Sequence, residues 1–173
     1  MYNFNTIKDY NEHLVRLKND ETYKNDYIIW KKNKENKIFQ LPSRLKHIAQ
    51  QIEEAKELLN YADDWDDEGA VAMDGPAFEK AAGFVIDYAT YIFKHFATVL
   101  SVPYIDILRD GSASVHWENK ENNQFLIVFK KEADDLAYYY AEQSDRKIPF
   151  KSAIVPNAPV DETLALWMKN HLS

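Results

Sequence analysis

The chain has 173 residues, a formal net charge of −7 at pH 7, 14% aromatic residues and no cysteine. Its length suits a single domain, and its hydrophobic and aromatic content excludes an intrinsically disordered or collagen-like chain. The lack of cysteine excludes disulfide bonds, a cysteine nucleophile and thiolate metal sites, and the negative charge argues against nucleic-acid binding by bulk electrostatics.

The charge is distributed unevenly along the chain. Residues 1–50 contain ten Lys and Arg against six Asp and Glu, whereas residues 51–173 contain eleven basic and twenty-two acidic residues. We therefore predict a basic, helical N-terminal arm over residues 1–40 and a folded acidic body over residues 41–173. No apolar run reaches the roughly 18 residues that a membrane span requires, and the first residues do not resemble a signal peptide.

Apolar spacing predicts helices in the first part of the chain. It favours a short helix over residues 6–18, while residues 22–33 fit a helix, which is slightly favoured, or a strand. Two long helices are predicted, one over residues 43–62 after Pro42 and one over residues 76–98. The apolar stripe of the second is so wide that we expect this helix to be buried on more than one side.

After Pro103 the apolar period changes from 3.6 to 2, which predicts strands. The expected strands are Tyr104–Arg109, Ala113–Glu118, Gln124–Lys131 and Leu136–Gln143, with Lys151–Val155 as a candidate fifth. Their short connections require antiparallel neighbours, so we predict a four- to five-stranded meander, followed by a helix over residues 159–172. The fold class is α+β, with long helices N-terminal to the sheet and one helix C-terminal to it. Because residues 125–129 are all apolar, we expect this strand to be central and covered on both faces.

The turn at Asp110-Gly111 offers two registers for the first hairpin. A two-residue turn would pair Arg109 with Ser112, whereas a three-residue loop would place Ile105 and Ile107 on one face with Val115 and Trp117. Burial of these four side chains, at roughly 25 cal/mol per Å² of apolar surface, outweighs the turn preference. We therefore predict the odd-length loop, with Gly111 in a left-handed conformation. Asp106 then shares a face with His116.

An acidic loop follows the first long helix, with five carboxylates around Trp65 in residues 63–68. Negative charge is unfavourable at a helix C-terminus, so a cation, a basic partner or the next helix N-terminus should compensate for it. Asp64, Asp66 and Glu68 match the opening of a calcium-binding loop, but its twelfth position is a glycine where a glutamate is required. We expect replacement of Asp66 and Asp67 by asparagine to leave thermal stability unchanged or slightly raised.

Two motifs carry a resemblance to a known group of proteins. The first is Trp65-Asp66-Asp67-Glu68-Gly69-Ala70, and the second is Asp110-Gly111 followed by Trp117. Together they resemble small uncharacterised bacterial proteins that carry a W-D-G-x-G-A loop between two helices and then a D-G…W hairpin. The resemblance covers roughly residues 45–130 and implies the architecture and a bacterial or phage origin, but no catalytic residue. The chain departs from that pattern at Asp67, where a glycine is usual.

His116 is the one histidine with potential catalytic neighbours, namely Asp106, Ser114 and Glu118. A Ser/His/Asp hydrolase would require a nucleophile elbow, and no Gly-x-Ser-x-Gly turn is present. The run of tyrosines at residues 138–140 could form an aromatic platform, but acidic residues flank it where single-stranded nucleic acid would need basic ones. Packing within the sheet, or contact with another protein, is the better interpretation.

These patterns favour a non-enzymatic, cytoplasmic protein-binding module over an enzyme. The predicted contact surface combines the acidic loop with an aromatic sheet surface; its residues are Trp65, Asp66, Asp67, Glu68, Gly69, Asp106, His116 and Tyr139. The predicted partner is a protein, for which a basic surface would be suitable; nucleic acid, membrane, cofactor, bound metal and catalytic residues are not predicted. One alternative is an acidic DNA mimic or inhibitor of a nucleic-acid enzyme. Another is a metal-dependent hydrolase that uses Asp64, Asp66 and Glu68.

Overall fold

The computed structural model describes residues 27–31, 38–131, 136–144 and 150–173. The chain divides into two compact units, residues 1–46 and residues 47–173. In the first unit, β1 (Tyr27–Lys31) pairs antiparallel with β2 (Ile38–Pro42), and η1 (Ser43–Leu45) follows as a short 3-10 helix. The slight preference for a helix over residues 22–33 is therefore wrong for residues 27–31, whose β-branched and aromatic residues pair as a strand. The helix expected over residues 6–18 lies outside the described residues.

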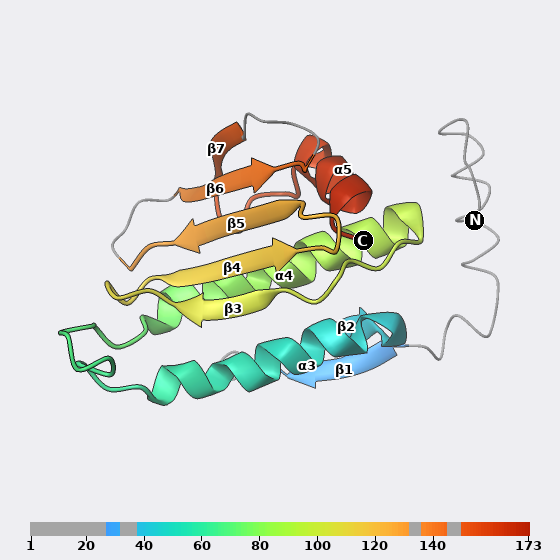
Figure 1. Ribbon diagram of the computed structural model, residues 1–173. Coiled ribbons are helices and arrows are strands. Elements are labelled where there is room, and N and C mark those ends of the chain that lie inside the picture. Colours follow the sequence, from blue (N-terminus) through green and yellow to red (C-terminus); the bar gives the residue numbers. More distant parts are fainter. Residues whose placement is uncertain (1–26, 32–37, 132–135, 145–149) are drawn as a thin grey trace. The chain divides into compact units, whose positions relative to one another are not determined.

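Two α-helices precede the main sheet (Figure 1). The first, α3 (Lys46–Ala55), continues into the 3-10 helix η2 (Lys56–Asn60), so its α-helical part is shorter than the sequence predicted. The second, α4 (Gly75–Phe96), begins where the Asp74 carboxylate accepts a hydrogen bond of 3.0 Å from the Ala77 N–H. It ends at Ala97, which adopts a left-handed conformation. No helix in the described ranges is both long and apolar enough to cross a membrane.

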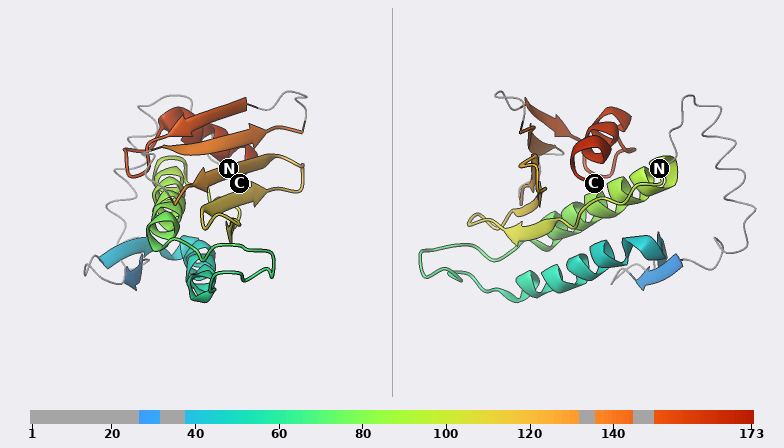
Figure 2. Two further views of the ribbon diagram at one scale, coloured as in Figure 1. Left: turned by 90° about the vertical axis from the view of Figure 1, so that its left-hand side faces the viewer. Right: turned by 45° about the vertical axis from the view of Figure 1, so that its right-hand side comes forward.

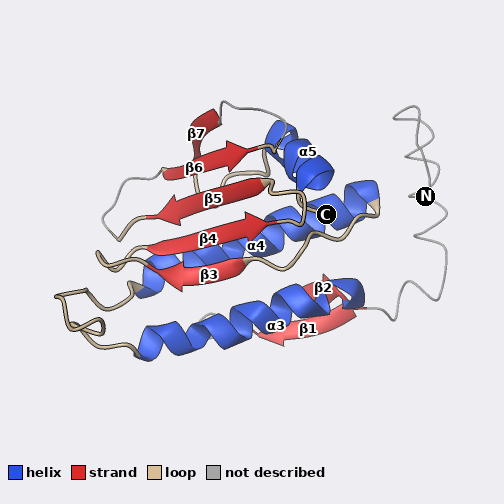
Figure 3. Cartoon of the chain, viewed as in Figure 1, coloured by secondary structure: helices blue, strands red, loops and turns tan. Residues whose placement is uncertain are grey.

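A five-stranded antiparallel sheet follows, with the strands in sequence order (Figure 3). It consists of β3 (Tyr104–Ile107), β4 (Ala113–Glu118), β5 (Gln124–Phe129), β6 (Ala137–Glu142) and β7 (Phe150–Ile154). After the sheet, α5 (Glu162–His171) starts at Asp161, whose carboxylate accepts a hydrogen bond of 2.9 Å from the Leu164 N–H. The mixed α+β class and the open antiparallel meander are confirmed.

The inner face of the sheet packs against helices. Phe84 on α4 lies 6.2 Å from Trp117, 6.1 Å from Phe125 and 5.8 Å from Phe129, measured between ring centroids. From α5, the Trp167 ring lies 6.0 Å from Phe125. Trp117, Phe125 and Phe129 are fully buried, so this aromatic cluster is the centre of the core of the second unit.

The outer face of the sheet is the face opposite α4 and α5, which lie on the same side (Figure 2). From β3 to β6 its residues are Tyr104, Asp106, Ser114, His116, Leu126, Val128, Tyr138 and Tyr140. The strand β5 is central, as predicted, but the expectation that it is covered on both faces is wrong. Leu126 is 37% exposed and Tyr138 46% exposed. Both α4 and α5 pack against the inner face of the sheet. The apolar side chains of β5 on the outer face are therefore exposed to solvent.

The independence of the body remains a prediction, and it can be tested by truncation. We expect a chain lacking residues 1–36 to unfold in a single cooperative transition, because residues 47–173 contain an aromatic core of their own. The measurement is thermal unfolding followed by near-ultraviolet circular dichroism, with the full chain as the control. A truncated chain without a cooperative transition would show that the N-terminal residues belong to the core.

Candidate functional site

The acidic loop between η2 and α4 is a compact turn that is stabilised by hydrogen bonds from its backbone N–H groups to its own carboxylate side chains. Three of its residues have positive φ angles: Asp64 at 65°, Asp67 at 58° and Gly69 at 86°. The Asp64 carboxylate accepts a hydrogen bond of 2.7 Å from the Gly69 N–H, and the Asp63 carboxylate accepts one of 2.8 Å from the Ala72 N–H. Side-chain oxygens thus satisfy backbone donors that the tight turn leaves without main-chain partners.

Asp66 is the centre of this arrangement. Its Oδ1 accepts hydrogen bonds from the N–H groups of Glu68 at 2.9 Å and Ala70 at 3.0 Å. Its Oδ2 lies 2.9 Å from the Nε of Arg109, and the Asp66 side chain is only 17% exposed. Partial burial acts to raise the pKa of Asp66, but the two backbone hydrogen bonds and the charge of Arg109 outweigh it and hold the pKa below its ordinary value.

Arg109 supplies the compensating positive charge that the sequence could not locate. Its guanidinium also lies 3.3 Å from the Glu68 carboxylate and donates a hydrogen bond to the Glu68 carbonyl. Sequence analysis missed this residue; the available signal was a single basic side chain immediately before the Asp110-Gly111 turn. The expectation that replacing Asp66 and Asp67 together by asparagine leaves stability unchanged assumed repulsion between like charges. Because Asp66 pairs with Arg109, we expect the loss of its charge to lower stability.

The acidic loop docks on the β3–β4 hairpin through main-chain contacts. The Val71 N–H donates to the Arg109 carbonyl at 2.8 Å, and the Asp74 N–H donates to the Gly111 carbonyl at 2.9 Å. Gly111 has a φ of 80°, and a Cβ built at this position would lie 2.6 Å from the Ala72 carbonyl oxygen. The two motifs of the sequence therefore meet in space, and Gly111 is required where they touch.

The register of this hairpin is as predicted. Leu108 and Ser112 close a three-residue loop through a 2.8 Å hydrogen bond, and the Gly111 N–H donates to the Leu108 carbonyl at 2.9 Å. Ile105 lies opposite Val115, and Ile105, Val115 and Trp117 are all buried on the inner face. The free energy gained by burying these apolar side chains therefore outweighs the preference for a two-residue turn and sets the loop length, as predicted.

Asp106 and His116 share the outer face, as the odd-length loop predicted, but they do not pair with each other. Asp106 lies opposite Ser114, and its carboxylate accepts a 2.8 Å hydrogen bond from the N–H of Ile107. His116 lies opposite Tyr104 on one side and Leu126 on the other. Among the described residues, no hydrogen bond or ion pair joins His116 to Asp106, so the geometry assembles no Ser/His/Asp trio.

The predicted aromatic residues divide between the two faces of the sheet. Tyr139 lies on the inner face, with its ring 5.4 Å from that of Phe125, so it belongs to the covered side rather than to an exposed aromatic surface. Tyr138 and Tyr140 lie on the outer face instead. Trp65 is half-buried in the acidic loop and donates a 3.3 Å hydrogen bond to the Val71 carbonyl.

The metal-dependent hydrolase hypothesis needs converging oxygen ligands. Asp64 and Asp66 direct oxygens to backbone N–H groups, and Glu68 lies against Arg109. Within the described part of the chain, no group of three His, Asp or Glu residues is placed to hold a metal ion. The geometry of the loop therefore supports a structural role for these carboxylates.

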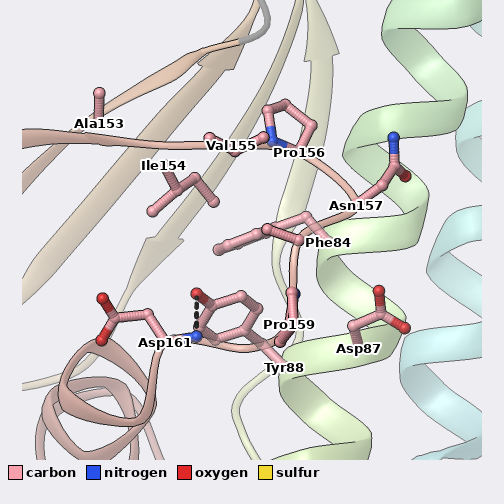
Figure 4. A pocket seen from close by; sticks show the side chains of 11 residues that line it. Phe84, Asp87, Tyr88, Ala153, Ile154, Val155, Pro156, Asn157, Pro159 and Asp161 are labelled. Atoms are coloured by element: carbon pink, nitrogen blue, oxygen red, sulfur yellow. Dashed lines mark hydrogen bonds between the residues drawn. The ribbon is translucent and has the colours of Figure 1, made fainter.

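A second candidate region is a cavity of about 260 Å³ on the helix side of the sheet (Figure 4). Its walls come from α4, from the end of β7 and from the segment that leads into α5. The sequence carried no signal for it, because its residues are separated by about seventy positions and are brought together only by packing.

Comparison of this chain with protein-family models, curated proteins and solved structures found no match. The resemblance to the bacterial W-D-G-x-G-A proteins therefore stays a prediction based on the two motifs.

Proposed function

We propose that the chain is a non-enzymatic protein-binding module and that its outer sheet face is the contact surface. The observation that carries this proposal is the exposure of large side chains there: Tyr104 is 67% exposed, Tyr138 46% and Leu126 37%. Tyrosine is enriched among the residues that supply most of the energy at protein interfaces, and a neighbouring leucine adds apolar area that is buried on binding.

The charges around the outer face indicate the chemistry of the partner. Asp106 lies on this face, and Glu118 and Glu142 lie at its β4 and β6 ends. Lys130 lies 5.7 Å from the centroid of the Tyr138 ring, so a basic side chain also lies near this surface. A partner with an apolar centre and a basic rim would complement this arrangement.

Fewer residues of the acidic loop are available to contact a partner than the sequence suggested. Asp66 is engaged within the loop, whereas Glu68 is 71% exposed and Asp67 is also exposed. These two carboxylates lie beside the β3–β4 turn and would extend the acidic rim. Trp65 and Gly69 shape the loop and are not expected to contact the partner directly.

Replacement of Leu126 by serine should disrupt this interface without disrupting the fold. The change removes an apolar contact at the centre of the outer face, and loss of a central interface residue weakens binding by roughly tenfold or more. A matched control is Leu166→Ser, because Leu166 is 46% exposed but lies on α5, away from the outer face. Both variants should keep the thermal stability of the wild type to within a few degrees.

The experiment is affinity capture from cells of the native host, followed by titration of the purified partner with both variants. We expect the partner to bind the wild type and Leu166→Ser equally and Leu126→Ser much more weakly, with affinity falling as salt is raised. Equal binding by all three proteins would place the interface elsewhere. Self-association through the outer face, detected by light scattering, would replace a separate partner with a second copy of the chain.

A further inference from the structure

The cavity of about 260 Å³ lies entirely within the second unit, and its lining combines apolar side chains with the polar side chains of Asp87, Asn157 and Asp161. Phe84 and Tyr88 face it from α4, while Ile154, Pro156 and Pro159 face it from the other side (Figure 4). An apolar cavity of about 150 Å³ accommodates benzene, so this cavity has room for a ring that carries a small substituent. Proline on one wall and a buried phenylalanine on the other keep its shape defined.

One polar group at the cavity is buried and incompletely satisfied. The Tyr88 side chain is 4% exposed, and its hydroxyl oxygen accepts a 3.2 Å hydrogen bond from the Asp161 N–H. Among the described residues, no acceptor receives the proton of this hydroxyl. Burial, followed by the nearby carboxylate charge of Asp161, raises the pKa of Tyr88 to about 12, although the Asp161 N–H acts against this increase. The hydroxyl is therefore a hydrogen-bond donor at any physiological pH.

The carboxylates at the cavity restrict the charge of a ligand. Asp87 and Asp161 both line it, and both repel negative charge at the Tyr88 oxygen. An anionic acceptor would meet this repulsion, whereas a neutral carbonyl would accept the proton without it. We propose that the cavity binds a small neutral organic molecule that combines one ring-sized apolar part with a carbonyl acceptor for the Tyr88 hydroxyl. This site is independent of the outer sheet face.

Three probes of one size test the proposal on the full chain labelled with ¹⁵N. Benzamide carries the ring and a neutral carbonyl, benzoate carries the ring and a negative charge, and toluene lacks an acceptor. We expect benzamide to shift the backbone amide resonances of residues 84–88 and of the non-proline residues among 153–161. We expect benzoate to bind roughly tenfold more weakly, and toluene to bind about threefold to tenfold more weakly because it forms no hydrogen bond.

Tyr88→Phe should remove the preference for benzamide over toluene while leaving toluene binding unchanged. Tyr91→Phe is the matched control, because it makes the same chemical change on α4 outside the cavity. Equal benzamide affinity in the wild type and Tyr88→Phe would overturn the proposal, as would shifts that do not map to the cavity. If Tyr88→Phe does not fold, the wild type alone decides: benzoate or toluene binding as strongly as benzamide refutes the assignment.

Discussion

Substitution of Gly111 by alanine should lower the free energy of unfolding by about 2–4 kcal/mol, since two penalties combine at this position. The backbone has a φ of 80°, a conformation that costs a residue with a Cβ roughly 1–2 kcal/mol. The new Cβ would also lie 2.6 Å from the Ala72 carbonyl oxygen, a backbone atom that cannot move without breaking the contact between the acidic loop and the hairpin. Urea denaturation at neutral pH measures the difference.

Gly69→Ala separates these two penalties. Gly69 has a φ of 86°, but a Cβ at this position would meet nothing within 4 Å. Its substitution should therefore cost only the conformational term, about 1–2 kcal/mol. If Gly69→Ala and Gly111→Ala destabilise the protein equally, the close approach of the loop to the hairpin does not contribute, and the docking of the two motifs must be weaker than the hydrogen bonds indicate.

Loss of the Asp66 side chain should lower the melting temperature by several degrees. Asp66→Ala removes the acceptor of two backbone N–H groups and the partner of Arg109 together. Asp66→Asn keeps an acceptor oxygen for the two backbone N–H groups but turns its amide NH2, a donor, toward the Arg109 guanidinium, so its effect should be smaller than that of Asp66→Ala. Asp67→Asn is the control, because the Asp67 side chain is exposed and forms no hydrogen bond or ion pair within the described structure. A melting temperature unchanged in Asp66→Ala would contradict the role assigned to this residue.

The pH dependence of stability gives a second readout of the same contacts. The pKa values of Asp66 and Asp110 are lowered in the folded state; for Asp110 the main cause is the hydrogen bond from the Ser112 N–H. When the folded state has the lower pKa, the unfolded state binds protons first as pH falls. The stabilisation is therefore present above the ordinary carboxyl pKa near 4 and is lost as pH falls below it. Melting temperatures of Asp66→Asn measured from pH 7 to pH 3 should fall less steeply than those of the wild type, whereas parallel curves would refute the assignment.

Local patterns were sufficient for much of the second unit. Alternating apolar residues predicted the strands, because a strand with one covered face must place every second side chain in the core. The three-residue loop before Ser112 also followed from the sequence, since the other register would have exposed Ile105 and Ile107. The sequence also predicted α4 and α5 to within a few residues of their observed starts at Gly75 and Glu162. The capping hydrogen bonds of Asp74 and Asp161 were seen only in the structure.

Other features depended on contacts that no local pattern contains. The strand at residues 27–31 could not be distinguished from a helix until its pairing with residues 38–42 was known, because a short apolar run fits both periods. The composition of residues 125–129 likewise indicated two covered faces, but α4 and α5 both pack on the inner face and leave Leu126 exposed.

The sequence by itself determined the α+β class, the antiparallel meander and the hairpin register, since each depends on side-chain burial that repeats along a few neighbouring residues. Only the tertiary structure decided the role of the acidic loop. Two of its five carboxylates, those of Asp66 and Glu68, pair with Arg109, which is more than forty positions away in the sequence, and the loop backbone closes against Gly111. An ion pair and a close main-chain contact of this kind depend on the distance in space between two segments that are far apart in the sequence. Neither composition nor apolar periodicity predicts that distance.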